Sequence, residues 1–309
     1  MSDVTHSLSW PSAVPQLSVL IPFLRDDPRS LLALLDREAE TLHGAVEIVL
    51  LDDGTGDTGL TAALTAEIAA MALPVHLITL STNEGRSKGR NRLSDAARGE
   101  YLLFLDSDMR PDTDRFLTHW LAIARDQRPA IVFGGFSLLQ APTDTRFAVH
   151  RSMAARSECV AADVRSQAPE KYVYTSNLLV RRDVFETAGF DPAFTGWGWE
   201  DVEWAMRVSR THSILHIDNA ATHMGLDTVE TLAAKYEQSA ANFARVVARH
   251  PDIVSSYPSF RAARALKPLP GLPLLRSVLR QVALSATLPV PARSFALRLY
   301  RAALYADVV

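Results

Sequence analysis

The sequence predicts an α/β fold with a mostly parallel central sheet flanked by helices, followed by a C-terminal helical extension. Short apolar runs of strand length at 17–22, 46–51, 75–80 and 101–105 alternate with segments that carry helical signals. Such alternation is typical of βαβ units and of parallel sheets. After residue 260 the chain becomes basic and apolar and contains no glutamate. This change in composition predicts a separate helical extension.

The first half of the chain supplies each expected element in turn. The run LSVLIP at 17–22 predicts a strand, and Pro28 opens a helical stretch through Glu40. The run VEIVLL at 46–51 predicts a second buried strand. The next expected elements are a helix at 60–71, a strand at 75–80, a helix at 87–98, the strand YLLFL at 101–105 and a strand at 131–136.

The regular alternation ends near residue 140. Residues 141–172 are mixed and polar, and we expect one helix with irregular flanks there. The following expected elements are a strand at 173–180, an acidic loop that runs into a helix at 197–210, a strand at 213–217 and an amphipathic helix at 228–249. Prolines at 268, 270 and 273 then predict a linker into the basic tail.

Composition excludes several classes of protein. Of the 309 residues, 48% are apolar and 22% are charged, which excludes a disordered chain and a coiled coil. The formal net charge of −3 does not indicate nucleic acid as a partner. The single cysteine, Cys159, cannot form an internal disulfide. We find neither a secretory signal nor an apolar run of about 18 residues, so we expect a cytoplasmic protein.

Charge is distributed unevenly along the chain. Residues 261–309 contain eight basic residues and one acidic residue, so they carry +7 while the rest carries −10. The basic residues are Arg261, Arg264, Lys267, Arg276, Arg280, Arg293, Arg298 and Arg301. Two interpretations remain open. The tail lies on an anionic membrane surface, at the inner face of the membrane, as interfacial helices do, or it packs on the acidic body.

Asp106, Ser107 and Asp108 directly follow the strand at 101–105. Two carboxylates with this spacing at a strand end can hold Mg²⁺ or Mn²⁺ together with phosphate oxygens. The simpler interpretation is a helix start, with an aspartate as cap before Pro111. His223 is of interest only if a second ligand such as Asp108 lies beside it.

Asp52 and Asp53 end another expected strand, where a carboxylate can accept a hydrogen bond from a base or a ribose. A turn is the alternative, because Asp-Asp-Gly-Thr-Gly is typical of turns. Residues 54–59 also match G-x-G-x-x-G, which suggests a dinucleotide site. That interpretation is disfavoured because the next strand does not end in an acidic residue.

Two further clusters contain side chains that can bind a phosphate or act as a general base. Residues 83–91 contain three cations and two glycines and open a helix, which suits a phosphate, although a solvated basic face is the usual alternative. Residues 196–201 place two tryptophans before Glu200 and Asp201. An aspartate beside apolar rings can have a raised pKa and act as a general base. The alternative is that both acids only complement a helix dipole.

Taken together, these clusters resemble the inverting glycosyltransferases of family 2, which have the Rossmann-like GT-A fold. The C-terminal motif also resembles the β-1,4-galactosyltransferase and chondroitin-synthase branch. The matching pieces are Ile21-Pro22-Phe23, Asp52-Asp53-Gly54, Asn83-x-Gly85 through Arg90-Asn91, Asp106-Ser107-Asp108, Gly196 through Asp201, and His223. The resemblance runs from about residue 17 to 245.

The resemblance implies a role for each matching residue. Pro22, Phe23 and Arg25 would frame the nucleobase and Asp53 would bind the base or ribose edge. The nucleotide would also be faced by Gly85, Arg86, Lys88, Arg90, Asp106 and Ser107. Asp108 and His223 would ligate Mn²⁺ or Mg²⁺, with Asp106 touching the ribose or a metal-bound water. Asp201 would be the general base, Glu200 would hold sugar hydroxyls, and Trp197, Gly198 and Trp199 would line the sugar site.

The implied activity is transfer of a hexose or N-acetylhexosamine from a nucleotide sugar, with UDP expected, to a glycan or lipid-linked acceptor. Leu24 departs from the family pattern, because many members carry an aromatic residue there, and Gly89 stands where alanine is commoner. We expect residues 1–250 to form the glycosyltransferase domain, with nucleotide-binding and acceptor halves at about 17–140 and 141–250. Residues 251–309 would form the basic helical tail.

Three other functions compete with this one. Sugar-1-phosphate nucleotidyltransferases resemble one another by a glycine-rich loop after the first strand, but residues 22–27 contain no glycine. A catalytically degenerate glycan-binding subunit would be expected to lack Asp108 or Asp201, and both are present. A dinucleotide oxidoreductase would have to use the glycine motif at 54–59.

Overall fold

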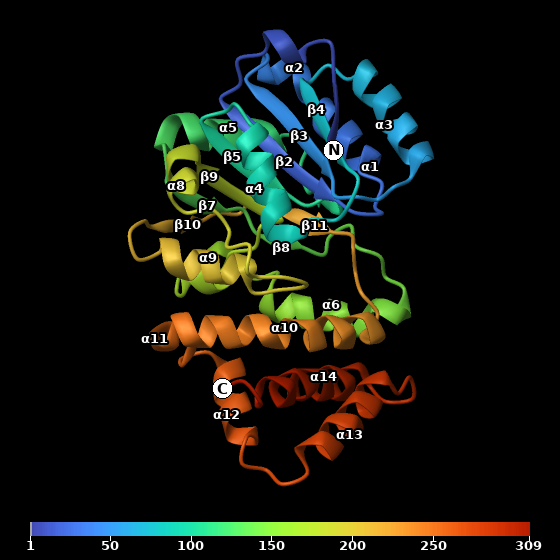
Figure 1. The fold of residues 1–309 in the computed structure, drawn as a ribbon, viewed down its shortest axis with the longest axis vertical. Coiled ribbons are helices and arrows are strands. Elements are labelled where there is room, and N and C mark those ends of the chain that lie inside the picture. The colour runs from blue at the N-terminus through green and yellow to red at the C-terminus, as the bar shows by residue number, and fades with distance from the viewer. Residues whose placement is uncertain (1) are drawn as a thin grey trace.

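The computed structural model describes residues 2–309, and its centre is an eight-stranded sheet with the order β1-β4-β3-β2-β5-β9-β7-β10 (Figure 1). Its strands are β1 (Ser2–His6), β2 (Leu17–Phe23), β3 (Val46–Asp52), β4 (Val75–Leu80), β5 (Tyr101–Leu105), β7 (Ile131–Phe133), β9 (Asn177–Arg181) and β10 (Ile214–His216). Strands β4, β3, β2 and β5 run parallel. Their carboxyl ends therefore meet at one edge.

Two strands of this sheet run against the others. The chain leaves β7 at the carboxyl edge and returns to that edge at residue 177, so β9 is antiparallel to both β5 and β7. The strand expected at 173–180 thus begins later, at Asn177. Strand β1 was not expected, because its sequence, SDVTH, has no apolar run. It exists through its antiparallel pairing with β4.

A second, three-stranded sheet lies at the carboxyl edge. It consists of β6 (Met109–Pro111), β11 (Ala221–His223) and β8 (Phe136–Ser137), with β11 in the middle. The strand expected at 131–136 is therefore split into β7 and β8. Gly135 at the break has φ +91°, and a Cβ there would come within 2.7 Å of the Arg165 guanidinium. The close approach of this arginine requires a glycine at the bend.

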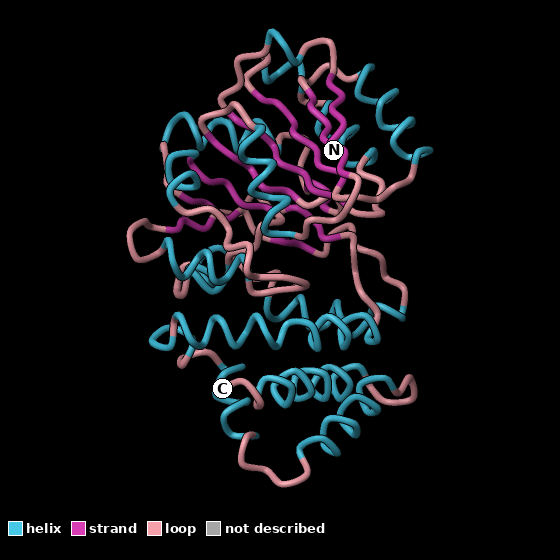
Figure 2. Tube along the Cα trace, in the orientation of Figure 1, coloured by secondary structure: helices cyan, strands magenta, loops and turns pink. Residues whose placement is uncertain are grey.

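Helices cover both faces of the large sheet and form the lower half of the molecule (Figure 2). They are α1 (Arg29–Asp36), α2 (Ala39–Leu42), α3 (Thr58–Ala70), α4 (Arg86–Ala96), α5 (Phe116–Gln127), α6 (Ala148–Ser157), α7 (Ala162–Arg165), α8 (Arg182–Thr187), α9 (Glu200–Val208), α10 (Val229–Arg249), α11 (Pro251–Val254), α12 (Pro258–Leu266), α13 (Leu272–Leu284) and α14 (Val290–Tyr305). Short 3₁₀ helices lie at Trp10–Ser12, Thr145–Phe147 and Pro169–Tyr172.

The helix expected from Pro28 through Glu40 is divided into α1 and α2. Glu38, at the division, is buried, and its carboxylate accepts hydrogen bonds from the backbone N–H groups of Leu117 and Thr118 in the first turn of α5. A carboxylate at a helix N-terminus satisfies backbone donors that have no partner in the helix. The break therefore positions a cap for α5.

Alternation along the strands creates two apolar cores, one on each face of the sheet. In β2, Leu17, Val19, Ile21 and Phe23 face one core with residues of α1, α3 and α5. Leu20 faces the other core with residues of α4, α8 and α9. Because side chains alternate between faces with period two, both faces of these strands are apolar, as expected for a covered parallel sheet.

The basic tail packs on the body of the protein. Helix α10 lies between the α/β half and the layer formed by α12, α13 and α14 (Figure 1). Leu297 and Tyr300 of α14 are buried against Met153 of α6 and Tyr236 of α10. Within residues 2–309, no helix combines the length and apolar character needed to cross a bilayer.

Candidate active site

Asp108 and His223 lie side by side at the carboxyl edge. The chain turns from β5 into β6 at Asp108, and β11 pairs with β6 so that His223 stands opposite Met109. As a result, His223 Nε2 lies 3.1 Å from Asp108 Oδ2. Burial would lower the pKa of His223, but the hydrogen bond and charge of Asp108, with Glu158 and Asp106, raise it. The two residues expected to share a cation are therefore brought together.

The backbone next to this pair leaves no room for another side chain. A Cβ on Gly225 would lie 1.9 Å from Asp108 Oδ2. The Met224 N–H donates to the Asp108 carbonyl oxygen at 2.9 Å. Glycine at position 225 is thus required for the Asp108 side chain to adopt this orientation.

Asp106 has different partners. Arg90 Nη2 donates to Asp106 Oδ1 at 2.7 Å and the Ser176 hydroxyl donates to Oδ2 at 2.8 Å. Burial would raise the pKa of Asp106, but Arg90, Arg86 and the Ser176 hydroxyl hold it below its ordinary value. Asp106 is therefore an ionised carboxylate bound to protein groups. In the described chain it is not part of a cluster of three metal-ligating side chains.

Arg90 connects two of the motifs. It is 2% exposed, and besides Asp106 its Nη1 lies 3.7 Å from Glu200 Oε1. Arg86, one helical turn earlier on α4, lies 3.5 Å from the same carboxylate oxygen. Arg90 was expected to face the nucleotide, but its buried position and its two carboxylate neighbours make it a positioning residue. Its Nε and Nη1 have no hydrogen-bond partner.

Asp201 opens α9 beside Glu200. One of its oxygens accepts a hydrogen bond from the Val202 N–H at 2.8 Å. Burial and the adjacent Glu200 raise the pKa of Asp201 to about 7, although Arg90 and Arg86 oppose the shift. A carboxylate with a pKa near the operating pH is suited to taking up a proton. The arrangement can therefore supply a general base.

The glycines and tryptophans before α9 form a tight loop. Trp199 has a left-handed backbone (φ 76°) and Gly198 also has positive φ (86°). The Trp199 indole N–H donates to the Tyr305 hydroxyl of α14 at 2.9 Å, and its ring packs on Phe243. Trp199 is therefore held in the helical layer, whereas half-buried Trp197 lies 6.0 Å from the ring of Tyr236.

Asp53 is buried at the end of β3. Its two oxygens accept hydrogen bonds from the backbone N–H groups of Glu84, at 2.7 Å, and Gly85, at 3.1 Å. Burial raises the pKa of Asp53 while these two hydrogen bonds oppose the shift. The carboxylate thus holds the loop that precedes α4. Gly54 is needed for the same contact, because a Cβ there would lie 2.6 Å from the backbone of Thr82 and Asn83.

The remaining residues expected at the nucleotide are placed differently. Phe23 is only 3% exposed and lies in the core beneath the sheet, so it is not available to frame a nucleobase. Pro22 is half-buried, and Arg25 is exposed with a left-handed backbone (φ 62°). Lys88 is exposed. Lys88 comes two residues after Arg86 on α4, so its side chain lies on nearly the opposite side of the helix. It therefore points away from Glu200, which Arg86 approaches. Ser107 is buried between the two aspartates.

Three residues near the pair were not anticipated. Burial and the charges of Asp108 and Asp106 raise the pKa of Asp26, which follows β2. Phe136 of β8 stacks on His223, with ring centroids 6.2 Å apart, and Tyr174 stacks on the same phenylalanine at 5.1 Å. Asp26 has a local signal, since it also follows a strand end. The two aromatic residues have none, because only the folding of 134–176 brings them here.

The Asp108–His223 pair fits a hard divalent cation. A carboxylate and an imidazole are both ligands for Mn²⁺, and Mg²⁺ commonly binds one or two protein carboxylates and completes its shell with water and substrate phosphates. Both side chains are partly exposed. In the part of the chain described, no third histidine, cysteine, aspartate or glutamate joins them. Any cation here would have open positions for phosphate oxygens.

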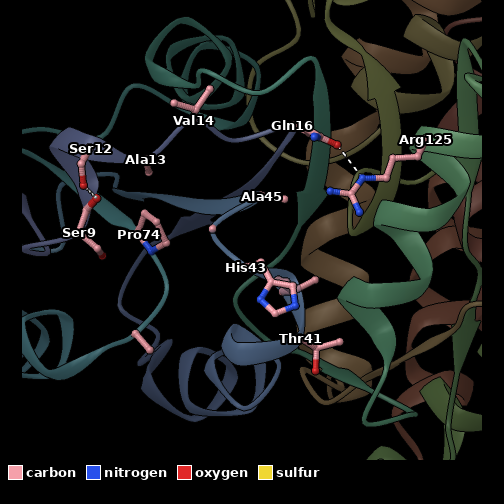
Figure 3. Close-up of a pocket in the computed structure, with 13 residues that line it drawn as sticks. Ser9, Ser12, Ala13, Val14, Gln16, Thr41, His43, Ala45, Pro74 and Arg125 are labelled. Atoms are coloured by element: carbon pink, nitrogen blue, oxygen red, sulfur yellow. Dashed lines mark hydrogen bonds between the residues drawn. The ribbon is translucent and has the colours of Figure 1, made fainter.

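One surface depression lies away from these residues. It has a volume of about 530 Å³ and is lined by Gln16, Ala45 and Pro74, which directly precede β2, β3 and β4 (Figure 3). Gln16 is held there by Arg125, whose Nε donates to its side-chain oxygen at 2.7 Å. Ligands of open α/β sheets bind at the carboxyl ends of strands. This depression at the amino ends is therefore separate from the candidate site.

Comparisons with known proteins identify the family of the chain. The family model described as glycosyl transferase family 2 matches residues 18–189. An N-acetylglucosaminyltransferase of Rhizobium leguminosarum bv. phaseoli is 28% identical over 109 residues, which are 35% of this chain and 25% of that protein. The putative teichuronic acid biosynthesis glycosyltransferase TuaG of Bacillus subtilis (strain 168) is 27% identical over 131 residues, 40% of this chain and 48% of that protein. The matched region spans less than half of either relative.

Solved structures share the fold. The mannosyltransferase PcManGT from Pyrobaculum calidifontis, in complex with GDP-Man and Mn²⁺, has a TM-score of 0.54 at 14% identity and covers 96% of this chain and 88% of that chain. TarS of S. aureus has a TM-score of 0.53 at 16% identity and covers 95% of this chain and 54% of that chain. Its residues 1–349, in complex with UDP-GlcNAc, have a TM-score of 0.50 at 17% identity, with 93% and 89% covered. The expected mostly parallel fold is thus confirmed.

Proposed function

Because the chain belongs to glycosyl transferase family 2, we propose that it is a metal-dependent, inverting enzyme that transfers a hexose or N-acetylhexosamine from a UDP-sugar. Family membership makes it a glycosyltransferase that uses a nucleotide sugar. The family match ends at residue 189. The likeness of residues 196–201 to the galactosyltransferase and chondroitin-synthase branch therefore stays a prediction.

One observation carries the proposal. Asp201 has a pKa raised to about 7 by burial and by Glu200, and the buried Arg90 links this pair to Asp106, two residues from Asp108.

The acceptor hydroxyl oxygen forms a bond with the anomeric carbon as the bond to the diphosphate breaks, and Asp201 takes up the hydroxyl proton. A single displacement from the face opposite the leaving group inverts the anomeric centre. Glu200, held by Arg86, would orient sugar hydroxyls.

Asp108 and His223 would hold the cation. When bound, Mn²⁺ or Mg²⁺ supplies positive charge that stabilises the departing diphosphate. Asp106, which accepts hydrogen bonds from Arg90 and Ser176, would fix the β5–β6 turn and would contact the ribose. Arg86 would meet the phosphates, while Pro22, Arg25, Asp53, Gly85 and Ser107 would border the nucleoside. Phe23 is left out of this set, because it is buried in the core.

Names of relatives support the choice of sugar. The Rhizobium relative is named an N-acetylglucosaminyltransferase, and the TarS structure contains UDP-GlcNAc. The PcManGT structure contains GDP-Man, so both uridine and guanosine donors occur among the structural neighbours. We place UDP first, and a glycan or lipid-linked glycan as acceptor. We also propose that residues 1–250 bind both substrates and that the tail at 251–309 supports them.

The tail would also meet an anionic membrane surface. Its outward side chains include Leu274, 72% exposed, and Phe295, 65% exposed, and exposed Arg264 and Lys267 lie in the same helical layer. From residue 253 to 306 the chain has no acidic residue. Apolar and cationic side chains together suit an interface with anionic lipid headgroups. The tail thus packs on the body with one side and leaves the other for a membrane.

Substitution of Asp201 by asparagine tests the base. Asp201→Asn keeps the shape of the side chain but cannot take up a proton. We expect transfer to fall by roughly 10²–10⁴-fold, the usual contribution of a general base. Binding of UDP, measured by calorimetry, should remain unchanged, because Asp201 does not touch the nucleotide. Loss of UDP binding in this variant would contradict the assigned role.

A further inference from the structure

We propose that Arg301 binds an anionic group of the acceptor, a phosphate or a carboxylate, on the side of the active site formed by α10 and α14. This inference rests on the proposed function and extends it to the class of acceptor. It uses a residue that lies 100 positions after Asp201 in the chain and far outside the matched family region.

Arg301 points its guanidinium among aromatic rings. The guanidinium carbon lies 5.2 Å from the ring centroid of Tyr236 on α10 and 5.8 Å from that of Tyr305 on α14. The side chain is half-buried. The Tyr236 hydroxyl is a hydrogen-bond partner of its guanidinium, and between residues 2 and 309 we find no carboxylate oxygen within 4.0 Å of it. It is a half-buried cation that no carboxylate in this part of the chain pairs with.

Other half-buried arginines of the same helical layer are satisfied by the protein. Arg276 donates to the Ala303 carbonyl oxygen at 2.7 Å and pairs with Asp307 at 2.7 Å. Arg293 donates to the Ala283 carbonyl oxygen at 3.0 Å. A guanidinium removed from water costs free energy unless it is paired. Arg276 and Arg293 thus have carbonyl or carboxylate partners within the tail, whereas the partners of Arg301 are tyrosines.

The aromatic rings around Arg301 connect it to the catalytic loop. The Tyr236 ring lies 6.0 Å from the Trp197 ring, and the Tyr305 hydroxyl accepts the Trp199 indole N–H at 2.9 Å. Trp197 and Trp199 directly precede Glu200 and Asp201. The cation is thus held against the loop that positions the proposed base.

Tyr174 is a third tyrosine whose hydroxyl is an electrostatic neighbour of Arg301. Its ring stacks on Phe136, which in turn stacks on His223. Burial raises the pKa of Tyr174, Glu158 and Asp201 raise it further, and Arg301 opposes them. The Tyr174 hydroxyl therefore lies within the electrostatic reach of both Asp201 and Arg301. An acceptor whose hydroxyl is at Asp201 could place a neighbouring group near Arg301.

The positive charge of Arg301 favours an anionic ligand. Burial would lower the pKa of Arg301, but the hydroxyls of Tyr305, Tyr236 and Tyr174 and then Glu158 raise it. The tyrosine hydroxyls are neutral near pH 7, so Glu158 is the carboxylate that faces this guanidinium. Guanidinium groups bind phosphate and carboxylate through paired N–H donors. Glu158 would weaken such binding, which gives a second variant with the opposite expected sign.

The test is a calorimetric titration of the full chain with two small anions. Glycerol 3-phosphate represents a phosphate acceptor, and glucuronate represents a carboxylate acceptor. Mn²⁺ and UDP are present at saturation, so that Arg86 and the metal pair are already occupied. Arg301→Gln should weaken binding of the preferred anion at least about tenfold, the size expected for a charge-assisted hydrogen bond. Glu158→Gln should strengthen it.

Arg298→Gln is the matched control, because Arg298 is an exposed arginine one turn earlier on α14. It should bind both anions like the wild type, and thermal melting should show that every variant folds. Arg301→Lys keeps the charge and should retain part of the affinity if Arg301→Gln is unstable. Equal anion affinity in Arg301→Gln and wild type, or no anion binding by wild type saturated with UDP, would overturn the inference. Failure of UDP itself to bind would instead contradict the proposed function, and the same titrations without UDP would then still report on Arg301.

Discussion

Asp201 combines two properties that conflict in most carboxylates. It is sheltered from water and adjacent to Glu200, which favours its protonated form, yet it must be ionised to accept a proton. Arg86 and Arg90 lie close to Glu200, and their positive charge opposes the rise in the pKa of Asp201. The result is a carboxylate poised near neutral pH, where uptake of a proton is most efficient.

This residue predicts the pH dependence of the reaction. The ionised fraction of Asp201 falls below its pKa of about 7, so kcat/KM should drop about tenfold for each pH unit on the acid side. The ordinary pKa of an aspartate is 3.8, so in the folded protein Asp201 takes up a proton at a higher pH. Steady-state rates from pH 5 to 9 measure the midpoint. A midpoint near pH 4 would mean that Asp201 is not the base.

How far the site could be predicted depends on how each residue is recruited. Asp53, Asp106 and Asp108 follow strands, and parallel strands end at one edge, so their proximity follows from local patterns. Phe23 was misassigned because it shares its strand face with Ile21, which is buried in the core. Arg301 carries no local signal, since only packing of the tail brings it beside Tyr236 and Tyr305.

At the scale of elements, the pairing of β6 with β11 brings Asp108 and His223 together. Register decides which side chains meet, and a shift of one residue would turn His223 to the other face. The alignment of His223 with Met109 places the imidazole beside Asp108. The sequence singled out both residues as candidate ligands, but β6 and β11 are only three residues long and were not expected as strands.

Removal of the cation should stop the reaction. We expect EDTA to reduce transfer at least about a hundredfold and Mn²⁺ to restore it, because positive charge on the leaving diphosphate is worth several kcal/mol. His223→Ala should raise the Mn²⁺ concentration needed for half-maximal rate. Calorimetric titration of Mn²⁺ in the presence of UDP checks this directly. Undiminished activity in chelator would contradict metal dependence.

At the scale of the whole molecule, the two halves differ in charge and in construction. The strands lie in one half and the C-terminal helices in the other (Figure 2). The sequence predicted the C-terminal helices, because the composition becomes basic near the start of this layer. The sequence did not predict the apolar contact between the two layers. Leu297 and Tyr300 of α14 are buried against α6 and α10.

The outward side of the tail predicts binding to anionic vesicles. Full-length protein should float with vesicles that contain phosphatidylglycerol and remain below vesicles of phosphatidylcholine alone, and added salt should weaken the binding. Leu274→Gln combined with Phe295→Gln should reduce flotation. Leu8→Gln is the control, because Leu8 is even more exposed, at 92%, but lies outside the tail. Point substitutions are preferable to truncation, which would uncover the apolar face of α10. Equal flotation by all variants would argue against this surface.

The hydrogen bond between Trp199 and Tyr305 has a consequence for biosynthesis. A ribosome releases the sheet and its aspartates long before it releases α14, and domains begin to fold during synthesis. The loop that carries Asp201 can reach its final shape only after residue 305 has left the exit tunnel. A nascent chain could thus bind the nucleotide early, yet it could not transfer the sugar until residue 305 has been synthesised and released.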